Sequence, residues 1–305
     1  MRFRPALVAA ALLAAFAPAL ALAQAAPPTK AAPQAITDVD PALWVVKDKN
    51  TTIYLFGTIH VLKPGLGWFD EAVKKAFDSS DELVQELVFP DAATTQAVVM
   101  KYSVATDGPP LTDQIPPEKR AAYAKAMTAL GIPANGFDRF KPWSAANNLT
   151  VLTLVKMGYD LNSGVEKTLT AAAEKEKKPI LGLETLDIQL GYFDGLPKDV
   201  QIAFLGETID ELPKVGEEIG AMIDRWSKGD PEGLAKELNE SLETSPVLAK
   251  ALLTDRNKRW ADWIKERMTR PGTVFIAVGA GHLAGKDSVQ AFLAKLHLKA
   301  KRIAY

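Results

Sequence analysis

Two histidines end segments of similar design, and imidazole is both a common metal ligand and a common general base. The apolar segment 52–56 leads into a G-x-x-H sequence that ends at His60, and the apolar segment 273–278 leads into a second one that ends at His282. Either histidine alone could be a structural residue, but the repetition favours a shared function. His297 has no such context, and we expect it to be structural or on the surface.

A glycine precedes each of these histidines by three residues, Gly57 in one segment and Gly279 in the other. Glycine allows the backbone to turn tightly, so we expect each histidine just past the carboxyl end of a strand. Ligand sites in open α/β sheets gather at those strand ends. The pattern therefore predicts that His60 and His282 converge on one site.

Two glutamates interrupt or end apolar segments and could complete a metal site. Glu86 lies within the apolar run 83–88, and Glu184 ends the run 180–184. A buried carboxylate is costly unless it is paired or bound to a metal, so both fit ligand or general-base roles. Alternatively, Glu86 faces outward on a half-exposed strand and Glu184 starts a helix. Two histidines with carboxylates would suit Zn, Mn, Co or Fe(II).

Several other chemistries lack their signatures. The chain has no cysteine, which excludes a cysteine nucleophile and a thiolate metal site. The sequences H-E-x-x-H, G-x-S-x-G and Walker A are absent. Gly279 and Gly281 resemble half of a dinucleotide-binding loop, but position 284 is alanine where a third glycine is required. We therefore reject dinucleotide binding at this segment.

Strands that alternate with helices predict an α/β fold, in which a sheet core is layered with helices. The segment 186–270 has an almost entirely helical pattern, and we expect it to form an insertion or cap on the sheet. The expected strands span 43–46, 52–56, 82–89, 179–183, 273–278 and 300–304, and the other expected helices span 70–79, 116–131, 142–157, 165–177 and 287–297.

The first residues have the pattern of a secretory signal peptide. Arg2 and Arg4 precede the apolar run 6–20, and a small-x-small cleavage pattern ends at Ala23. An uncleaved membrane anchor is the alternative, but the run is shorter than the roughly 20 apolar residues of a spanning helix. We predict a signal peptide over residues 1–23 and export to the periplasm or beyond.

The remaining chain is expected to be a flexible Ala/Pro-rich lead over residues 24–38 and one domain over residues 39–305. No transmembrane helix is expected in it. The formal net charge of the whole chain is −1, and removal of the two arginines in residues 1–23 lowers it to about −3. With no basic surplus, we expect no nucleic-acid binding.

Five short segments, in this order along the chain, resemble the TraB/GumN family. They are 54–61 (YLFGTIHV), 83–86 (LVQE), 182–185 (GLET), 255–257 (DRN) and 278–283 (VGAGHL). This family also includes the Tiki-type proteases and is thought to share its fold with erythromycin esterases and the ChaN-like proteins. The resemblance implies a pseudo-symmetric α/β core, and it implies a metal-dependent protease that favours manganese or cobalt.

The resemblance also assigns residues by position. His60, Glu86, Glu184 and His282 would line the metal centre, and the two loop glycines would be Gly57 and Gly279. Arg256 and Asn257 match an Arg-Asn pair of the family. Arg256 would clamp a carboxylate or stabilise an oxyanion; the alternative is a surface ion pair.

We therefore expect a metal-dependent hydrolase that acts on a peptide or protein. The ion would lower the pKa of a bound water, and one of Glu86 and Glu184 would serve as the general base. A non-catalytic protein that binds or sequesters peptides on the same fold is the alternative. A polysaccharide-associated factor is a third and weaker possibility. Substrate, metal identity and oligomeric state stay open.

Overall fold

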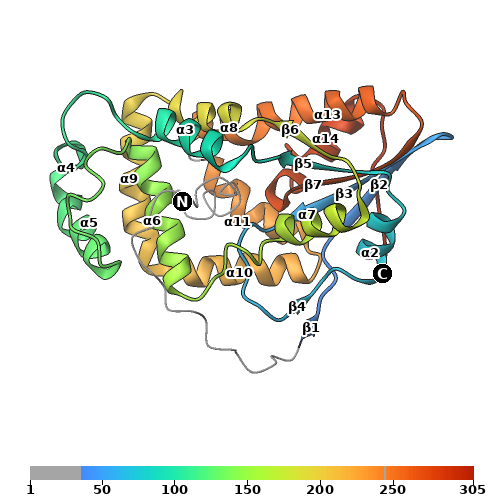
Figure 1. The fold of residues 1–305 in the computed structure, drawn as a ribbon, viewed down its shortest axis with the longest axis horizontal. Coiled ribbons are helices and arrows are strands. Elements are labelled where there is room, and N and C mark those ends of the chain that lie inside the picture. Colours follow the sequence, from blue (N-terminus) through green and yellow to red (C-terminus); the bar gives the residue numbers. More distant parts are fainter. Residues whose placement is uncertain (1–35, 244) are drawn as a thin grey trace.

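The computed structural model describes residues 36–243 and 245–305 of the chain (Figure 1). The signal peptide expected over 1–23, and the lead as far as residue 35, lie outside the described residues. At the end of the expected lead, Thr37–Asp38 forms strand β1 and pairs in parallel with β4, Leu66–Gly67. Regular structure therefore begins before the expected domain start at residue 39.

A mixed sheet with the strand order β6-β5-β7-β3-β2-β8 forms the centre of the fold. Strands β6, β5, β7 and β3 run parallel to one another, whereas β2 is antiparallel to both β3 and β8. The predicted α/β class is confirmed; β2 and β3 form a hairpin, and β8 is the edge strand beside β2. The strands are β2 (Leu43–Lys47), β3 (Thr51–Thr58), β5 (Glu82–Leu87), β6 (Ile180–Glu184), β7 (Gly272–Gly279) and β8 (Lys301–Arg302).

The two strands that carry the G-x-x-H motifs are direct neighbours. Strands β3 and β7 pair in parallel from Thr51↔Gly272 to Thr58↔Gly279, so both end at the same edge of the sheet. Both are apolar along most of their length because helices cover them on both faces. The expected convergence of the two motifs at one edge of the sheet is present.

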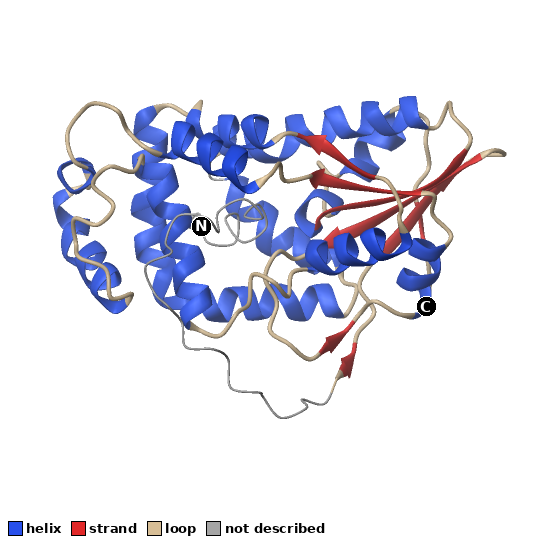
Figure 2. Cartoon of the chain, viewed as in Figure 1, coloured by secondary structure: helices blue, strands red, loops and turns tan. Residues whose placement is uncertain are grey.

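Helices pack on each face of the sheet (Figure 2). Alternate residues of β3 point to opposite faces, as the two-residue period of a strand requires. Ile53 and Leu55 pack with α13 (Asp255–Arg267) and α14 (Val289–Lys295). Phe56 contributes to the other core. That second face is covered by α2 (Glu71–Asp78), α7 (Val165–Glu176), α10 (Val215–Ser227) and α11 (Pro231–Glu243).

A separate hydrophobic cluster joins the helices beside the sheet. The rings of Trp143 and Phe193 stack with centroids 5.4 Å apart, and Phe204 lies 6.3 Å from Phe193. Around these rings pack α3 (Ala92–Ser103), α4 (Leu111–Gln114), α5 (Pro117–Ala129), α6 (Pro142–Lys156), α8 (Leu186–Asp194), α9 (Lys198–Glu211) and α12 (Pro246–Ala249). This helical lobe therefore draws on residues before position 186 as well as after it.

The segment 186–270 is helical, as predicted, but its helices serve two different cores. Helices α8 and α9 belong to the lobe, whereas α10, α11 and α13 cover the sheet. The sequence pattern had not indicated α3, whose first turn is capped by Asp91 through a bond from Thr94 N at 3.0 Å. Within the described residues, no helix combines the length and apolar character needed to cross a membrane.

Gly57 and Gly279 differ from the expectation that they lie in tight turns. Gly57 lies within β3 and Gly279 is the last residue of β7, and neither has a positive φ. The reason for glycine at position 57 is a close approach, because a Cβ there would lie 3.0 Å from Ala280 Cα. Glycine thus lets the turn after β7 pack against β3.

We expect Gly57→Ala to lower the free energy of unfolding by about 1–3 kcal/mol, because backbone atoms must move to admit the methyl group. Urea unfolding measures this change. The matched control is Gly220→Ala in α10, where a Cβ would meet no atom within 4 Å. That control should be neutral or stabilising by up to about 1 kcal/mol. Equal effects of the two substitutions would contradict the close-approach explanation.

Candidate functional site

Two glutamates and an arginine form a buried ionic cluster at the carboxyl ends of the parallel strands. Glu86 is near the end of β5, Glu184 ends β6, and Arg256 lies in the first turn of α13. Their side chains are 8%, 3% and 2% exposed. The alternatives of an outward-facing Glu86 and of a surface ion pair at Arg256 are therefore wrong. Charges this deeply buried must be paired.

All five N–H donors of Arg256 have acceptors within the protein. Nη2 donates to Glu86 Oε2 at 2.7 Å and to Glu184 Oε2 at 2.8 Å. Nε donates to Glu184 Oε1 and Oε2 at 3.0 and 3.2 Å. Nη1 is 3.1 Å from His282 Nε2 and 3.4 Å from the Leu252 carbonyl oxygen. In this arrangement no donor remains for a substrate carboxylate or an oxyanion.

The two carboxylates have further donors besides the guanidinium. Gln189 Nε2 donates to Glu86 Oε2 at 3.3 Å and to Glu184 Oε2 at 3.1 Å. The Tyr192 hydroxyl donates to Glu184 Oε1 at 3.1 Å, and Gly279 N donates to Glu86 Oε1 at 2.6 Å. Burial, followed by the charge on Glu184, raises the pKa of Tyr192 to about 12. The phenol therefore stays protonated as a donor at neutral pH.

The electrostatics of Arg256 follow from the same contacts. Burial alone would lower the pKa of the guanidinium, but the charges on Glu86 and Glu184 raise it above its usual value. The ring of Trp260 lies 4.7 Å from the guanidinium carbon and supports one of its faces. Arg256 is thus a permanent buried cation.

His282 is held neutral beside this cation. Because Arg256 can only donate, His282 Nε2 accepts and the proton is on Nδ1, which faces Asn257 Oδ1 at 2.5 Å. Asn257 Nδ2 in turn donates to the Asp287 carbonyl oxygen at 2.7 Å. Burial first, then the charge on Arg256, holds the pKa of His282 well below its usual value. Asn257 therefore positions His282.

His60 has a different partner. Its Nδ1 lies 2.6 Å from Glu166 Oε1, and the two side chains are 4% and 19% exposed. Burial would raise the pKa of Glu166, but the charge of His60, together with hydrogen bonding from His60 and Thr58, holds it below its usual value. His60 is close enough to His282 for its charge to contribute to the lowered pKa of that residue.

The helix that bears Glu166 approaches the backbone of His60 very closely. Val165 N donates to the Ile59 carbonyl oxygen at 3.1 Å, and a Cβ at Gly164 would overlap the His60 carbonyl group. Gly164 therefore allows α7 to begin against the G-x-x-H turn. This contact places Glu166, in the first turn of α7, beside the imidazole.

A short π-helical segment sets the direction of Arg256 and Asn257. The segment η2 (Lys250–Thr254) lies between α12 and α13, and its Leu252 carbonyl oxygen accepts from Arg256 Nη1. Single π-turns within helices often occur at functional sites, because the extra residue changes which side chains face inward. Both Arg256 and Asn257 are buried.

The predicted metal ligands do not fit a divalent ion as they are arranged. A metal needs several lone pairs directed at one point. Glu86, Glu184 and His282 instead direct theirs at Arg256, and His60 pairs with Glu166. Within the part of the chain that the structure describes, no group of three or more His, Asp or Glu side chains is placed to hold a metal. The metal ion stays an untested prediction.

The structure brings together most of the residues that the sequence singled out. Glu86, Glu184, Arg256, Asn257, Gly279 and His282 share one cluster, and His60 lies nearby in its own pair. Sequence reasoning missed Glu166, Gln189 and Tyr192. The spacing of Gln189 and Tyr192, which lie three residues apart just after Glu184, placed both on one helical face and was the available signal. Glu166 looked like one more residue of a polar helix face.

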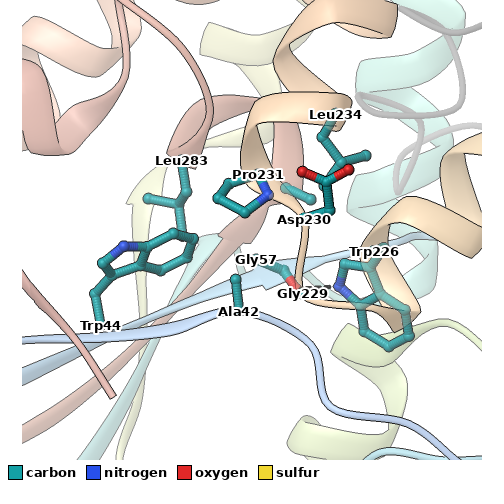
Figure 3. A pocket seen from close by; sticks show the side chains of 10 residues that line it. Ala42, Trp44, Gly57, Trp226, Gly229, Asp230, Pro231, Leu234 and Leu283 are labelled. Carbon is teal, nitrogen blue, oxygen red and sulfur yellow. Dashed lines mark hydrogen bonds between the residues drawn. The ribbon is translucent and has the colours of Figure 1, made fainter. Parts of the chain in front are cut away.

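A small apolar hollow lies beside Gly57 (Figure 3). Trp44, Trp226, Pro231 and Leu283 are among its lining residues. The indole Nε1 of Trp226 donates to the Gly57 carbonyl oxygen at 2.8 Å. None of the charged residues of the buried cluster lines this hollow.

The mixed sheet defines an α/β protein, and buried glutamates, an arginine and histidines gather at the carboxyl ends of its parallel strands. The chain belongs to the TraB/PrgY/gumN family, whose family model matches residues 42–302. The resemblance seen in the five short motifs is thereby confirmed.

Two relatives extend the comparison over most of the chain. The uncharacterized protein YbaP of Escherichia coli (strain K12) is 24% identical over 253 residues, which cover 83% of this chain and 92% of the relative. An uncharacterized protein of Treponema pallidum (strain Nichols) is 22% identical over 289 residues, which cover 88% and 84%. No solved structure gave a significant match to the chain.

The free energy of unfolding should decrease as the pH falls below 6.5, because the unfolded chain then protonates His282 while the folded chain does not. Above pH 6.5 neither state binds this proton, so no contribution is expected there. One such group adds a slope of up to about 1.4 kcal/mol per pH unit. Urea unfolding on both sides of pH 6.5 should show a shallower slope for His282→Gln than for the wild type. Identical slopes would contradict a neutral, buried His282.

Proposed function

We propose that this protein is a hydrolase in which His60, oriented by Glu166, acts as the general base. The observation that supports the proposal is the distance of 2.6 Å between His60 Nδ1 and Glu166 Oε1, beside a buried ionic cluster at the strand ends. A carboxylate at one ring nitrogen fixes the tautomer and stabilises the imidazolium that forms on protonation. The lowered pKa of Glu166 keeps that carboxylate ionised.

The reaction then follows the chemistry of a positioned base. In its neutral form, His60 takes a proton at Nε2 from a water molecule as the water oxygen bonds to the carbonyl carbon of the substrate. The imidazolium returns the proton to the leaving group as the scissile bond breaks. Glu166 stays negatively charged throughout and offsets the positive charge on His60.

The buried cluster has a positioning role in this proposal. Glu86, Glu184 and Arg256 are saturated with hydrogen bonds, so they hold neighbouring groups rather than exchange protons with a substrate. Through Nη1, Arg256 fixes the imidazole of His282. His282 cannot serve as a base while its Nε2 lone pair is occupied by that bond. The two histidines therefore have different tasks.

The proposal includes a peptide or protein substrate and a location in the periplasm. The first rests on the family resemblance, since Tiki-type members are proteases. The second rests on the charged, apolar and small-residue pattern of residues 1–23. No step of this reaction requires a divalent ion.

His60→Gln should lower kcat/KM by about 10²–10⁴-fold, which is the usual contribution of a general base. Glu166→Gln should lower kcat and shift the acidic limb of the pH–rate profile, because the neutral amide no longer stabilises the imidazolium. The measurement is hydrolysis of a fluorogenic peptide library together with simple aryl esters.

His297→Asn is the matched control, because His297 is exposed, has a φ of 62° that asparagine tolerates, and lies in the turn just after α14 ends at Lys295. Its activity should equal that of the wild type. Hydrolysis that is unaffected by His60→Gln would refute the proposal. Peptide binding without any turnover, retained in His60→Gln, would favour the alternative of a sequestering protein.

A further inference from the structure

One carboxylate oxygen from each of the two glutamates lies against the same nitrogen of Arg256. Glu86 Oε2 and Glu184 Oε2 lie 2.7 and 2.8 Å from Nη2, and the amide of Gln189 reaches the same two oxygens. A cation shared by two carboxylates would occupy this point, and a guanidinium nitrogen already does. The positive charge of Arg256 thus offsets the negative charge of the two glutamates, as a metal ion would.

The guanidinium has no free direction in which to move aside. Its Nη1 is bonded to His282 and lies near the Leu252 carbonyl oxygen, and its carbon lies 4.7 Å from the Trp260 ring and 5.6 Å from the Tyr192 ring. A second cation beside it would face a fixed positive charge in a region of low dielectric constant.

The other carboxylate oxygens also accept hydrogen bonds within the protein. Glu86 Oε1 accepts from Gly279 N, and Glu184 Oε1 accepts from Tyr192 and from Arg256 Nε. A metal bound at about 2.0–2.2 Å from these oxygens would have to displace several hydrogen bonds at once. Displacement without replacement would leave buried polar groups unsatisfied.

We propose that Arg256 takes the place of a divalent metal ion between Glu86 and Glu184, so that these carboxylates bind no metal in the wild-type protein and become a metal site only when Arg256 is removed. The inference concerns metal binding alone. It is measured without substrate, so its failure and the failure of the proposed hydrolase activity are distinguishable.

The first experiment measures binding of Mn²⁺ to the purified wild-type protein by electron paramagnetic resonance, with elemental analysis after dialysis. We expect no uptake that depends on Glu86. Stoichiometric Mn²⁺ binding to the wild type that is lost in Glu86→Gln would overturn the proposal.

The second experiment compares Arg256→Ala with Arg259→Ala, which removes an exposed arginine three residues further along the same helix. Arg259 donates to the Tyr192 hydroxyl but contacts neither glutamate. We expect Arg256→Ala to bind Mn²⁺ at least 100-fold more tightly than the wild type and to gain thermal stability from it, whereas Arg259→Ala does neither. Adding Glu86→Gln to Arg256→Ala should abolish the gain.

Two buried carboxylates without a counter-charge are destabilising, so Arg256→Gln serves as the second variant. Its amide fills part of the vacated volume and still donates hydrogen bonds. Refolding of either variant in the presence of Mn²⁺, but not in its absence, supports the proposal. A folded Arg256 variant that binds no Mn²⁺ would overturn it.

Discussion

The pairing of one buried guanidinium with two buried carboxylates constrains everything else at the site. Removing water from three charges is tolerated only when each has a close opposite charge and its remaining lone pairs and protons are satisfied. Arg256 meets this condition because its hydrogen bonds to Glu86 and Glu184 join α13 to β5 and β6. Its Nη1 also contacts His282, which follows β7. The relative positions of one helix and three parallel strands therefore follow from a single set of charge-assisted hydrogen bonds.

Equivalent motifs have acquired different chemistry on this sheet. His60 and His282 both end a G-x-x-H sequence on adjacent parallel strands, yet one faces a carboxylate and the other an amide. Glu166 lies beside His60, whereas burial first and then the charge of Arg256 hold the pKa of His282 well below its usual value. The partner of the second ring nitrogen decides what a histidine can do, even where the backbone repeats.

The sequence alone predicted those features that depend on a single segment of the chain. Strands β3 and β7 are largely apolar runs, and the charge of Glu86 within the otherwise apolar end of β5 indicated a site residue. The role of Glu166 could not be predicted, because an acid in the first turn of a polar helix is usually solvated. It lies beside His60 only because α7 packs against the chain at Gly164. The misread role of Gly57 has the same origin, because the Ala280 backbone that it must accommodate lies far away in the chain. Both features depend on contacts between distant segments, which the local sequence pattern does not show.

The π-helical segment before Arg256 makes the site sensitive to chain length in an unusual way. Each residue of an α-helix turns the chain by about 100°, so removal of one residue from Lys250–Thr254 would let α12 continue regularly and turn the arginine away from the glutamates. Loss or gain of one codon in this segment would therefore change whether the arginine faces the glutamates, while the reading frame of the rest of the chain is kept.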